Sequence, residues 1–226
     1  LTGRLRTLTP LECERLNGFP DNWTNTGMPE KMRYFCMGNA LVVKIVQRIA
    51  EQIIKMSKEA YENGASLIVF PELCVTGYTC GDLFLQNTLI KSAEEAVAKI
   101  VEETKAFDIV LVIGVPISEK HSLYNCGMII YKGEILGAVP KTHLPSHSEF
   151  SEGRYFSKGE DFDRAISYAN QDNVWVSANI IFTCLDFEDF SFGVEICEDL
   201  WVASSPSIRL AENGATIICN LSASNA

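Results

Sequence analysis

The sequence predicts an α/β fold for most of the chain. From Ser66 onward, short apolar runs rich in Val, Ile and Phe alternate with stretches of helical periodicity. The 226 residues are 47% hydrophobic and 21% charged, which is ordinary for a globular protein built as one large domain or two small ones. No apolar run approaches the ~20 residues of a membrane span, and residues 1–10 contain no apolar signal-peptide segment. We therefore expect a cytoplasmic protein without membrane contact.

Cysteine usage and charge narrow the class of protein further. None of the eight cysteines is spaced C-x-x-C, and the three histidines have no metal-ligand spacing, so we expect reduced thiols and no metal. Residues 1–50 carry a net charge of +3 and residues 51–226 a net charge of −13. A basic face for nucleic acid is therefore excluded from the main body, although the first fifty residues could contribute to one.

The first 65 residues are expected to contain three helices. Thr9 and Pro10 begin a helix that ends near Gly18, and residues 29–36 form a second short one. One continuous helix should then run from about Asn39 to Asn63, where Asn63 and Gly64 end it. We expect its apolar stripe (Val42, Ile45, Ile49 and Ile53) to be buried.

Strands and helices alternate from there to the end. A hairpin is expected around Lys132 and Gly133, and residues 142–178 have the composition of a loop. Helices are predicted at 89–106 and 206–213. Strands are predicted at 66–70, 109–115, 124–132, 134–139, 180–185, 190–196 and 215–221.

Three of these strands end in a residue that can do chemistry. Glu72 follows the first strand, Lys141 follows the hairpin, and Cys197 ends the run that contains Val194 and Ile196. A cysteine in an apolar run is usually a small core residue, and a Glu or Lys after a strand is usually a turn or a solvated side chain. Their joint placement at strand ends nevertheless supplies a base, a cation and a thiol, which is a complete set for acyl transfer. Glu72 would accept the thiol proton, while Lys141 would stabilise the oxyanion.

Motifs around these residues resemble the nitrilase-type glutaminase domain of glutamine-dependent NAD synthetases. The resemblance covers about 175 residues, from about residue 50 onward. It rests on Phe70-Pro71-Glu72-Leu73 with Thr76-Gly77-Tyr78 and Gly81-Asp82-Leu83-Phe84, on Leu123-Tyr124-Asn125, on Val139-Pro140-Lys141 with Leu144-Pro145 and Glu149-Phe150, on Val194-Glu195-Ile196-Cys197-Glu198-Asp199, and on Asn220-Leu221-Ser222.

The resemblance implies a nitrilase-like α-β-β-α sandwich in which Glu72, Lys141 and Cys197 hydrolyse glutamine through a γ-glutamyl thioester. It also implies that Glu149 orients Lys141 and that Tyr78 and Glu198 lie around the substrate. The step needs no cofactor, whereas the ATP and magnesium of the family serve a ligase domain that amidates deamido-NAD. The complete protein would be a homo-oligomer.

The sequence departs from this family pattern at two places. Ser146-His147 and Ser151 stand where the family has an Asn-Tyr pair and a further Tyr. The family's first strand, its last elements and its ligase domain are not in the sequence. We therefore expect an incomplete domain with weak glutaminase activity.

The first fifty residues resemble another family. Arg6-Thr7-Leu8-Thr9-Pro10 through Gly18-Phe19-Pro20, and Arg33-Tyr34 through Gly38-Asn39-Ala40-Leu41, are similar to the carboxyl-terminal end of cytosine-5 DNA methyltransferases. The family's Pro-Cys nucleophile loop is missing, so we expect no methylation and no nucleic-acid partner. We predict a helical segment over residues 1–50 and a carbon-nitrogen hydrolase domain over residues 51–226. The alternatives are another nitrilase-class amidase, a non-catalytic fusion product and a DNA-binding remnant.

Overall fold

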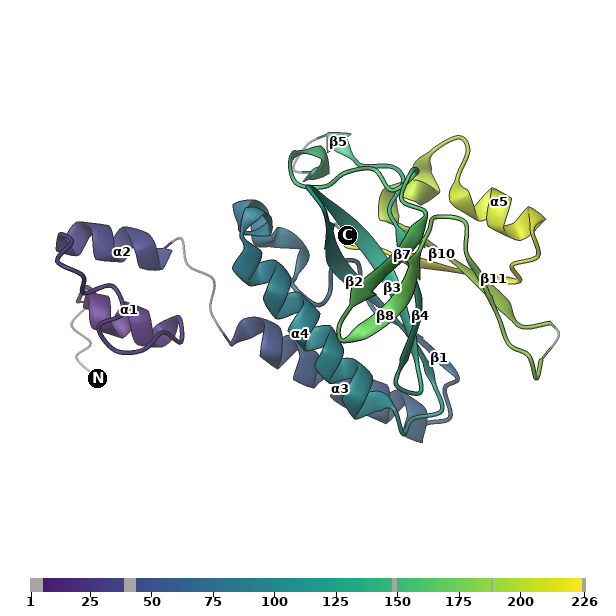
Figure 1. Cartoon of the computed structure of the whole chain (residues 1–226), viewed down its shortest axis with the longest axis horizontal. Helices are drawn as coiled ribbons and strands as arrows, with labels where there is room; N and C mark the ends of the chain where they lie inside the picture. The colour runs from purple at the N-terminus through teal and green to yellow at the C-terminus, as the bar shows by residue number, and fades with distance from the viewer. Residues whose placement is uncertain (1–5, 39–43, 148–149, 188, 225–226) are drawn as a thin grey trace. The chain divides into compact units, whose positions relative to one another are not determined.

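The computed structural model describes residues 6–38, 44–147, 150–187 and 189–224. The chain divides into two compact units, Leu1–Arg48 and Ile49–Ala226 (Figure 1). Within the described residues, no helix is long and apolar enough to cross a membrane. All the proposed catalytic residues lie in the second unit.

The first unit contains the two short helices expected from the sequence, α1 (Pro10–Leu16) and α2 (Glu30–Gly38). Thr9 caps α1 in a capping box, because its hydroxyl accepts from the Glu12 amide and the Glu12 carboxylate accepts from the Thr9 amide at 2.8 Å. The buried Glu14 carboxylate of α1 accepts hydrogen bonds from Thr24 and, at 3.0 Å, from Arg33 of α2. One buried carboxylate thus joins the two helices.

Helix α3 (Ile45–Glu62) is continuous, as predicted, and Gly64 ends it with a φ of +82°. The predicted start near Asn39, and Val42 of the predicted stripe, lie outside the described residues. The prediction that Ile45 is buried was wrong, since 44% of it is exposed. The apolar residues of this helix cover more than one face. The buried face is rotated about the helix axis from the predicted stripe and consists of Val46, Ala50, Ile53 and Ser57.

The larger sheet has six strands in the order β1-β2-β3-β4-β8-β7. Strands β3 and β4 form the predicted hairpin, with Lys132 and Gly133 both at positive φ. The expectation of a loop over residues 142–178 was wrong, because β7 and β8 form a second hairpin there around Ala169 and Asn170. The strands are β1 (Leu67–Val69), β2 (Val110–Glu119), β3 (Ser122–Tyr131), β4 (Glu134–Pro140), β7 (Arg164–Tyr168) and β8 (Gln171–Val176).

A smaller sheet packs on the larger one. It has the order β11-β10-β9, with β9 (Ile181–Thr183), β10 (Ser191–Ile196) and β11 (Ile217–Leu221). Side chains from both sheets form one apolar cluster, so the sheets lie face to face. Its buried members are Val112, Ile129 and Val139 from the larger sheet and Phe182, Phe192, Val194, Cys219 and Leu221 from the smaller one.

Helices cover the outer faces of the two sheets. Helix α4 (Asn87–Thr104) packs on β2 and β3 and lies beside α3, with Lys99 and Glu51 3.5 Å apart (Figure 1). Helix α5 (Pro206–Glu212) packs on β10 and β11. The layers therefore follow the order helix, sheet, sheet, helix. The short remaining elements are β5 (Ser146–His147), β6 (Phe150–Ser151) and the 3-10 helices η1 (Tyr78–Leu85), η2 (Glu152–Arg154) and η3 (Cys197–Trp201).

Candidate active site

Glu72 lies just beyond the carboxyl end of β1 and is 2% exposed. Its position depends on Gly114 of β2. A Cβ atom at Gly114 would lie 2.2 Å from the Leu73 amide nitrogen and 2.5 Å from the Pro71 carbonyl oxygen. Only a glycine therefore allows the Glu72 turn to lie this close to the neighbouring strand.

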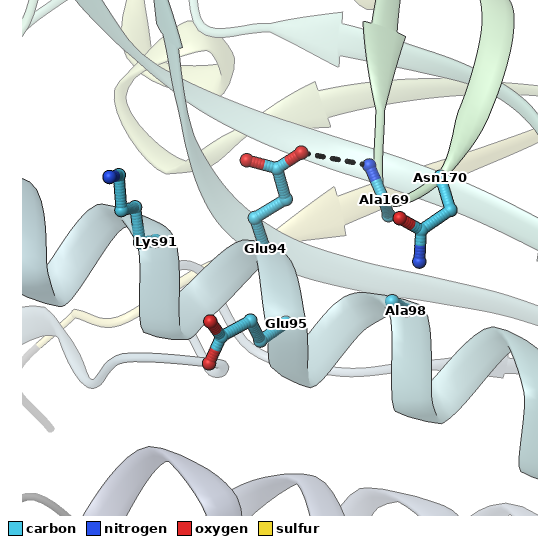
Figure 2. A pocket seen from close by; sticks show the side chains of 6 residues that line it. All are labelled: Lys91, Glu94, Glu95, Ala98, Ala169 and Asn170. Atoms are coloured by element: carbon cyan, nitrogen blue, oxygen red, sulfur yellow. Dashed lines mark hydrogen bonds between the residues drawn. The ribbon is translucent and has the colours of Figure 1, made fainter.

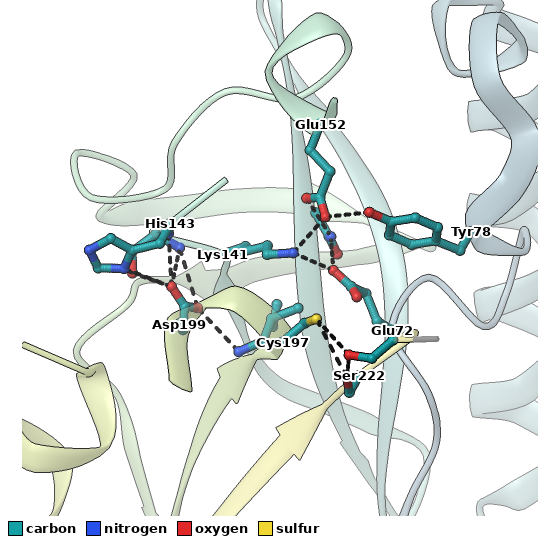
Figure 3. Close-up of polar contacts among 12 residues, drawn as sticks. Glu72, Tyr78, Lys141, His143, Glu152, Cys197, Asp199 and Ser222 are labelled. Atoms are coloured by element: carbon teal, nitrogen blue, oxygen red, sulfur yellow. Dashed lines mark hydrogen bonds and ion pairs between the residues drawn. The ribbon is translucent and has the colours of Figure 1, made fainter. Parts of the chain in front are cut away.

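Lys141 follows β4 and is 1% exposed. Its ammonium nitrogen donates to Glu72 Oε1 at 2.6 Å and to Glu152 Oε1 at 2.6 Å (Figure 3). Its backbone amide donates to the Asn125 carbonyl oxygen on β3 at 2.8 Å, which fixes the main chain. Two carboxylates thus surround one buried cation.

Glu152 begins η2 directly after the β5–β6 hairpin and is 4% exposed. Besides Lys141, it accepts a hydrogen bond from the Tyr78 hydroxyl at 2.7 Å. Asn125 bridges the two carboxylates, since its side-chain nitrogen lies 2.7 Å from Glu72 Oε1 and 3.4 Å from Glu152 Oε2. Four residues, Glu72, Lys141, Glu152 and Asn125, thus form a cluster in which each hydrogen-bonds to at least two others.

Cys197 lies where β10 gives way to η3, and its φ of +45° is in the left-handed region. A non-glycine residue there is strained by about 1–3 kcal/mol, and such strain is common at functional sites. The Cys197 side chain is half-buried, and its Sγ points toward the Glu72–Lys141 cluster (Figure 3). The hydroxyls of Ser222 and Ser224 each lie 3.4 Å from Sγ.

Burial and charge shift the ionisation of the cluster. Burial raises the pKa of Glu72, and the Glu152 carboxylate adds to this effect against the opposing influence of Lys141. Burial alone would lower the pKa of Lys141, but the two carboxylates outweigh it and the pKa is raised. Burial also raises the pKa of Tyr78, with further contributions from Glu152, Glu72 and Cys197. Tyr78 therefore stays protonated and donates to Glu152.

Besides Asn125 Oδ1, a carboxylate oxygen and an ammonium proton of the cluster have no partner among the described residues. Glu72 Oε2 is buried and accepts no hydrogen bond from the described residues. Lys141 uses two of its three ammonium protons on carboxylates in that same part of the chain, which leaves the third free. A carboxylate oxygen that can accept a proton and an ammonium proton that can stabilise an oxyanion are thus available beside a thiol.

A cavity of about 480 Å³ adjoins the cluster. Tyr78 and Glu152 form one part of its wall, and Ser151, Phe84 and Ala223 line other parts. A second hollow of about 350 Å³ lies between α4 and the β7–β8 turn, where Glu94 accepts from the Ala169 amide at 3.1 Å (Figure 2). Neither hollow is lined by a cysteine of the described part of the chain, but only the first is lined by Glu152 of the cluster and by Tyr78, which donates to it. Among the described residues, no group of three or more His, Cys, Asp or Glu could hold a metal ion.

The structure brings four of the predicted site residues together: Glu72, Tyr78, Lys141 and Cys197. Glu149 lies outside the described residues, and the carboxylate found beside Lys141 is Glu152. Glu198 is half-buried in η3, and its carboxylate makes no hydrogen bond with the described part of the chain.

Sequence reasoning missed the roles of Glu152, Asn125 and Asp199. Glu152 is the second glutamate of the Glu149–Glu152 segment, and its place directly after β6 turns it toward Lys141. Asn125 and Asp199 were inside motifs that carry the resemblance, but no residue pattern indicated what they contact.

Comparison with known proteins identifies the family of the larger part of the chain. Residues 43–226 match the family model described as carbon-nitrogen hydrolase. The chain belongs to the carbon-nitrogen hydrolase family. A glutamine-dependent NAD(+) synthetase of Mycobacterium tuberculosis is 37% identical over 175 residues, which are 77% of this chain and 26% of that protein. The chain thus spans about a quarter of the length of the curated relatives it matches.

A solved structure supports the fold assignment. The crystal structure of a glutamine-dependent NAD(+) synthetase from Cytophaga hutchinsonii superposes with a TM-score of 0.67 at 27% identity. The match covers 80% of this chain and 28% of that one. The predicted nitrilase-like sandwich is therefore confirmed.

The first residues match a different family. Residues 2–55 match the model described as C-5 cytosine-specific DNA methylase. The type II methyltransferase M.Sau3AI of Staphylococcus aureus is 60% identical over 68 residues, which are 30% of this chain and 16% of that protein. The predicted methyltransferase-like segment is confirmed, and the two family matches overlap over residues 43–55.

Proposed function

We propose that Glu72, Lys141 and Cys197 hydrolyse the side-chain amide of glutamine through a γ-glutamyl thioester. The observation that carries this proposal is the buried Glu72–Lys141–Glu152 cluster, toward which Cys197 Sγ points from a left-handed turn. The relatives that match the hydrolase part of the chain include several named glutamine-dependent NAD(+) synthetase, and this favours glutamine as the amide.

The first half of the reaction forms the thioester. Glu72 accepts the thiol proton as Sγ attacks the amide carbon, so that a C–S bond forms and the carbonyl oxygen becomes an oxyanion. The free ammonium proton of Lys141 stabilises that oxyanion. When the C–N bond breaks, Glu72 returns the proton to the leaving nitrogen, which departs as ammonia.

The second half releases glutamate. Water attacks the thioester carbon while Glu72 accepts a water proton, the C–S bond breaks, and the proton returns to Sγ. Glu152 keeps Lys141 charged and in place throughout, because it supplies a second carboxylate at 2.6 Å. In this proposal Tyr78 lines the substrate cavity and also orients Glu152, Glu198 contacts the substrate, and neither half needs a cofactor.

The ammonia acceptor belongs to a part of the protein outside this chain in our proposal. The relatives are NAD(+) synthetases, of which this chain matches about a quarter. We place there an ATP- and magnesium-dependent ligase domain that amidates deamido-NAD in a homo-oligomer. We assign the hydrolase domain to residues 51–226 and no catalytic part to residues 1–50.

Labelling with a glutamine-mimicking chloroketone tests the proposal. We expect a single covalent adduct at Cys197, located by mass spectrometry, that Cys197→Ser abolishes and the matched control Cys80→Ser retains. Cys74 and Cys219 should stay unlabelled, because burial raises the pKa of Cys74 to about 12 and that of Cys219 to about 11. An adduct at Cys74 or Cys80 would contradict the choice of nucleophile.

Ammonia release distinguishes the choice of substrate. The purified chain should release ammonia from glutamine faster than from asparagine or a short aliphatic amide, with Cys197→Ala as the blank. A preference for the short amide would instead make the chain another nitrilase-class amidase.

A further inference from the structure

The residues of the proposed triad come from two different sheets. Glu72 and Lys141 follow strands of the larger sheet, whereas Cys197 follows β10 of the smaller one. No ladder of backbone hydrogen bonds joins β4 to β10, so the pleated sheet does not set the distance between Lys141 and Cys197. Something else must hold the two strand ends in register.

Asp199 is placed to hold them. It is 1% exposed and lies two residues after Cys197 in η3. Its Oδ1 accepts from the Thr142 hydroxyl at 2.6 Å and from the His143 amide at 2.8 Å, directly after Lys141. Its Oδ2 accepts from the Ile196 amide at 3.1 Å, directly before Cys197 (Figure 3).

Further donors surround the same carboxylate. The Thr142 amide lies 3.2 Å and the His143 Nδ1 atom 3.0 Å from Oδ1. Among the described residues, all side-chain and backbone hydrogen bonds that link the segment after β4 to the end of β10 go through Asp199. The apolar cluster between the sheets resists their separation, but apolar packing is not directional and does not by itself fix their sliding register.

We propose that Asp199 is a positioning residue that sets the register between Lys141 and the Cys197 nucleophile. The inference rests on the proposed function of that triad. The hydrogen bond to the Ile196 amide also holds the turn in which Cys197 has its positive φ, and without it the turn can relax toward an unstrained conformation. Because a displacement of about 1 Å can cost about a hundredfold in rate, Asp199 acts on the chemistry without touching the substrate.

Asp199→Asn tests the proposal sharply, because neither orientation of the amide satisfies both strand ends. With its oxygen toward Thr142 and His143, its NH₂ group meets the Ile196 amide, donor against donor. With the amide flipped, the NH₂ group meets the Thr142 and His143 donors instead. Thr142→Val and Thr142→Ser form a second pair, since valine keeps the shape and serine keeps the hydroxyl that donates to Oδ1.

Glu195→Gln is the matched control. Glu195 lies on the same strand, is also 1% exposed, and accepts from Ser205 at 2.8 Å, from the Ser207 amide and from Asn220. These contacts tie β10 to α5 and β11, not to Lys141. Asn220 can turn its amide to suit a glutamine, so this variant should fold.

The experiment measures the concentration dependence and pH dependence of chloroketone labelling at Cys197 on the full chain. We expect Asp199→Asn to lower the maximal labelling rate at least tenfold, with less than a threefold change in the half-saturating concentration. Thr142→Val should show a smaller loss that Thr142→Ser restores, and Glu195→Gln should stay within threefold of the parent chain. Circular dichroism and thermal unfolding report whether each variant is folded.

Three outcomes would overturn the proposal: an unchanged maximal rate in folded Asp199→Asn, equal losses in Asp199→Asn and Glu195→Gln, or identical rates in Thr142→Val and Thr142→Ser. If Asp199→Asn does not fold, the Thr142 pair decides. Glu72→Gln separates this proposal from the proposed function. If Glu72→Gln leaves labelling unchanged, the triad itself fails, whereas slow labelling in Glu72→Gln with normal labelling in Asp199→Asn rejects only the positioning role.

Discussion

Replacing Glu72 by Gln and Lys141 by Met should separate the catalytic from the structural role of the buried cluster. Ionised, the cluster holds two carboxylates, Glu72 and Glu152, and one ammonium. Glu72→Gln leaves Lys141 paired with Glu152, so the buried charges balance. The glutamine oxygen can keep both hydrogen bonds that Glu72 Oε1 now accepts, while its NH₂ group takes the place of Oε2, which has no partner among the described residues.

The two variants should therefore differ in stability. We expect Glu72→Gln to change the free energy of unfolding by no more than about 1 kcal/mol. Lys141→Met leaves two buried carboxylates without their cation, which should cost about 3–5 kcal/mol and lower Tm by roughly 6–20 °C for a chain of this size. Labelling of Cys197 should nevertheless fall in both, by roughly 100- to 10,000-fold in Glu72→Gln, the usual contribution of a general base.

Urea unfolding, followed by tryptophan fluorescence, and chloroketone labelling on the same preparations provide the two measurements. Equal destabilisation by both variants would mean that Glu72 is a structural counter-ion. Unchanged labelling in a folded Glu72→Gln would mean that it is not the base. Either result would refute the catalytic interpretation of the cluster.

Three further predictions follow from individual contacts. Because Glu152 raises the pKa of Glu72, Glu152→Gln should move the acid limb of Cys197 labelling to lower pH, and an unmoved or upward-shifted limb would contradict the coupling. Gly114→Ala should displace the Glu72 turn and slow labelling by on the order of a hundredfold, whereas Gly153→Ala, whose added Cβ has no atom within 4 Å, should not; equal rates would exclude this role of the glycine. Thr9→Ala should cost the first unit about 1 kcal/mol by loss of the α1 cap, seen by circular dichroism, and should leave labelling unchanged; slower labelling would contradict the division of roles.

The sequence was most informative where chemistry coincides with a local pattern. Apolar runs before Glu72, Lys141 and Cys197 predicted three strand ends. The strands before Lys141 and Cys197 are largely buried and must therefore be apolar, whereas β1 before Glu72 is only partly buried. The caps at Thr9 and Gly64 likewise predicted the helix ends, since both satisfy local backbone requirements.

It was least informative where a contact depends on distant parts of the chain. The β7–β8 hairpin was missed for two reasons. Its turn, Ala169-Asn170, lacks the usual Asn-Gly signal, and exposed residues, several of them polar, interrupt the apolar pattern along both strands. Glu152 was missed because two glutamates three residues apart are equivalent in sequence, and the contact of Glu152 with Lys141 depends on the fold around β6.

The distribution of polar contacts between the two sheets explains why the site depends on tertiary register. Glu72, Lys141, Glu152 and Asn125 hydrogen-bond to one another within the larger sheet and its loops, so this cluster can form without the thiol. Cys197 contacts Ser222 and Ser224 on the side of the smaller sheet. In the proposed reaction neither half performs acyl transfer alone, because Glu72 and Cys197 meet only when the sheets are packed in one register. Substitutions that shift the sheets against each other should therefore abolish the chemistry while both halves of the site stay locally intact.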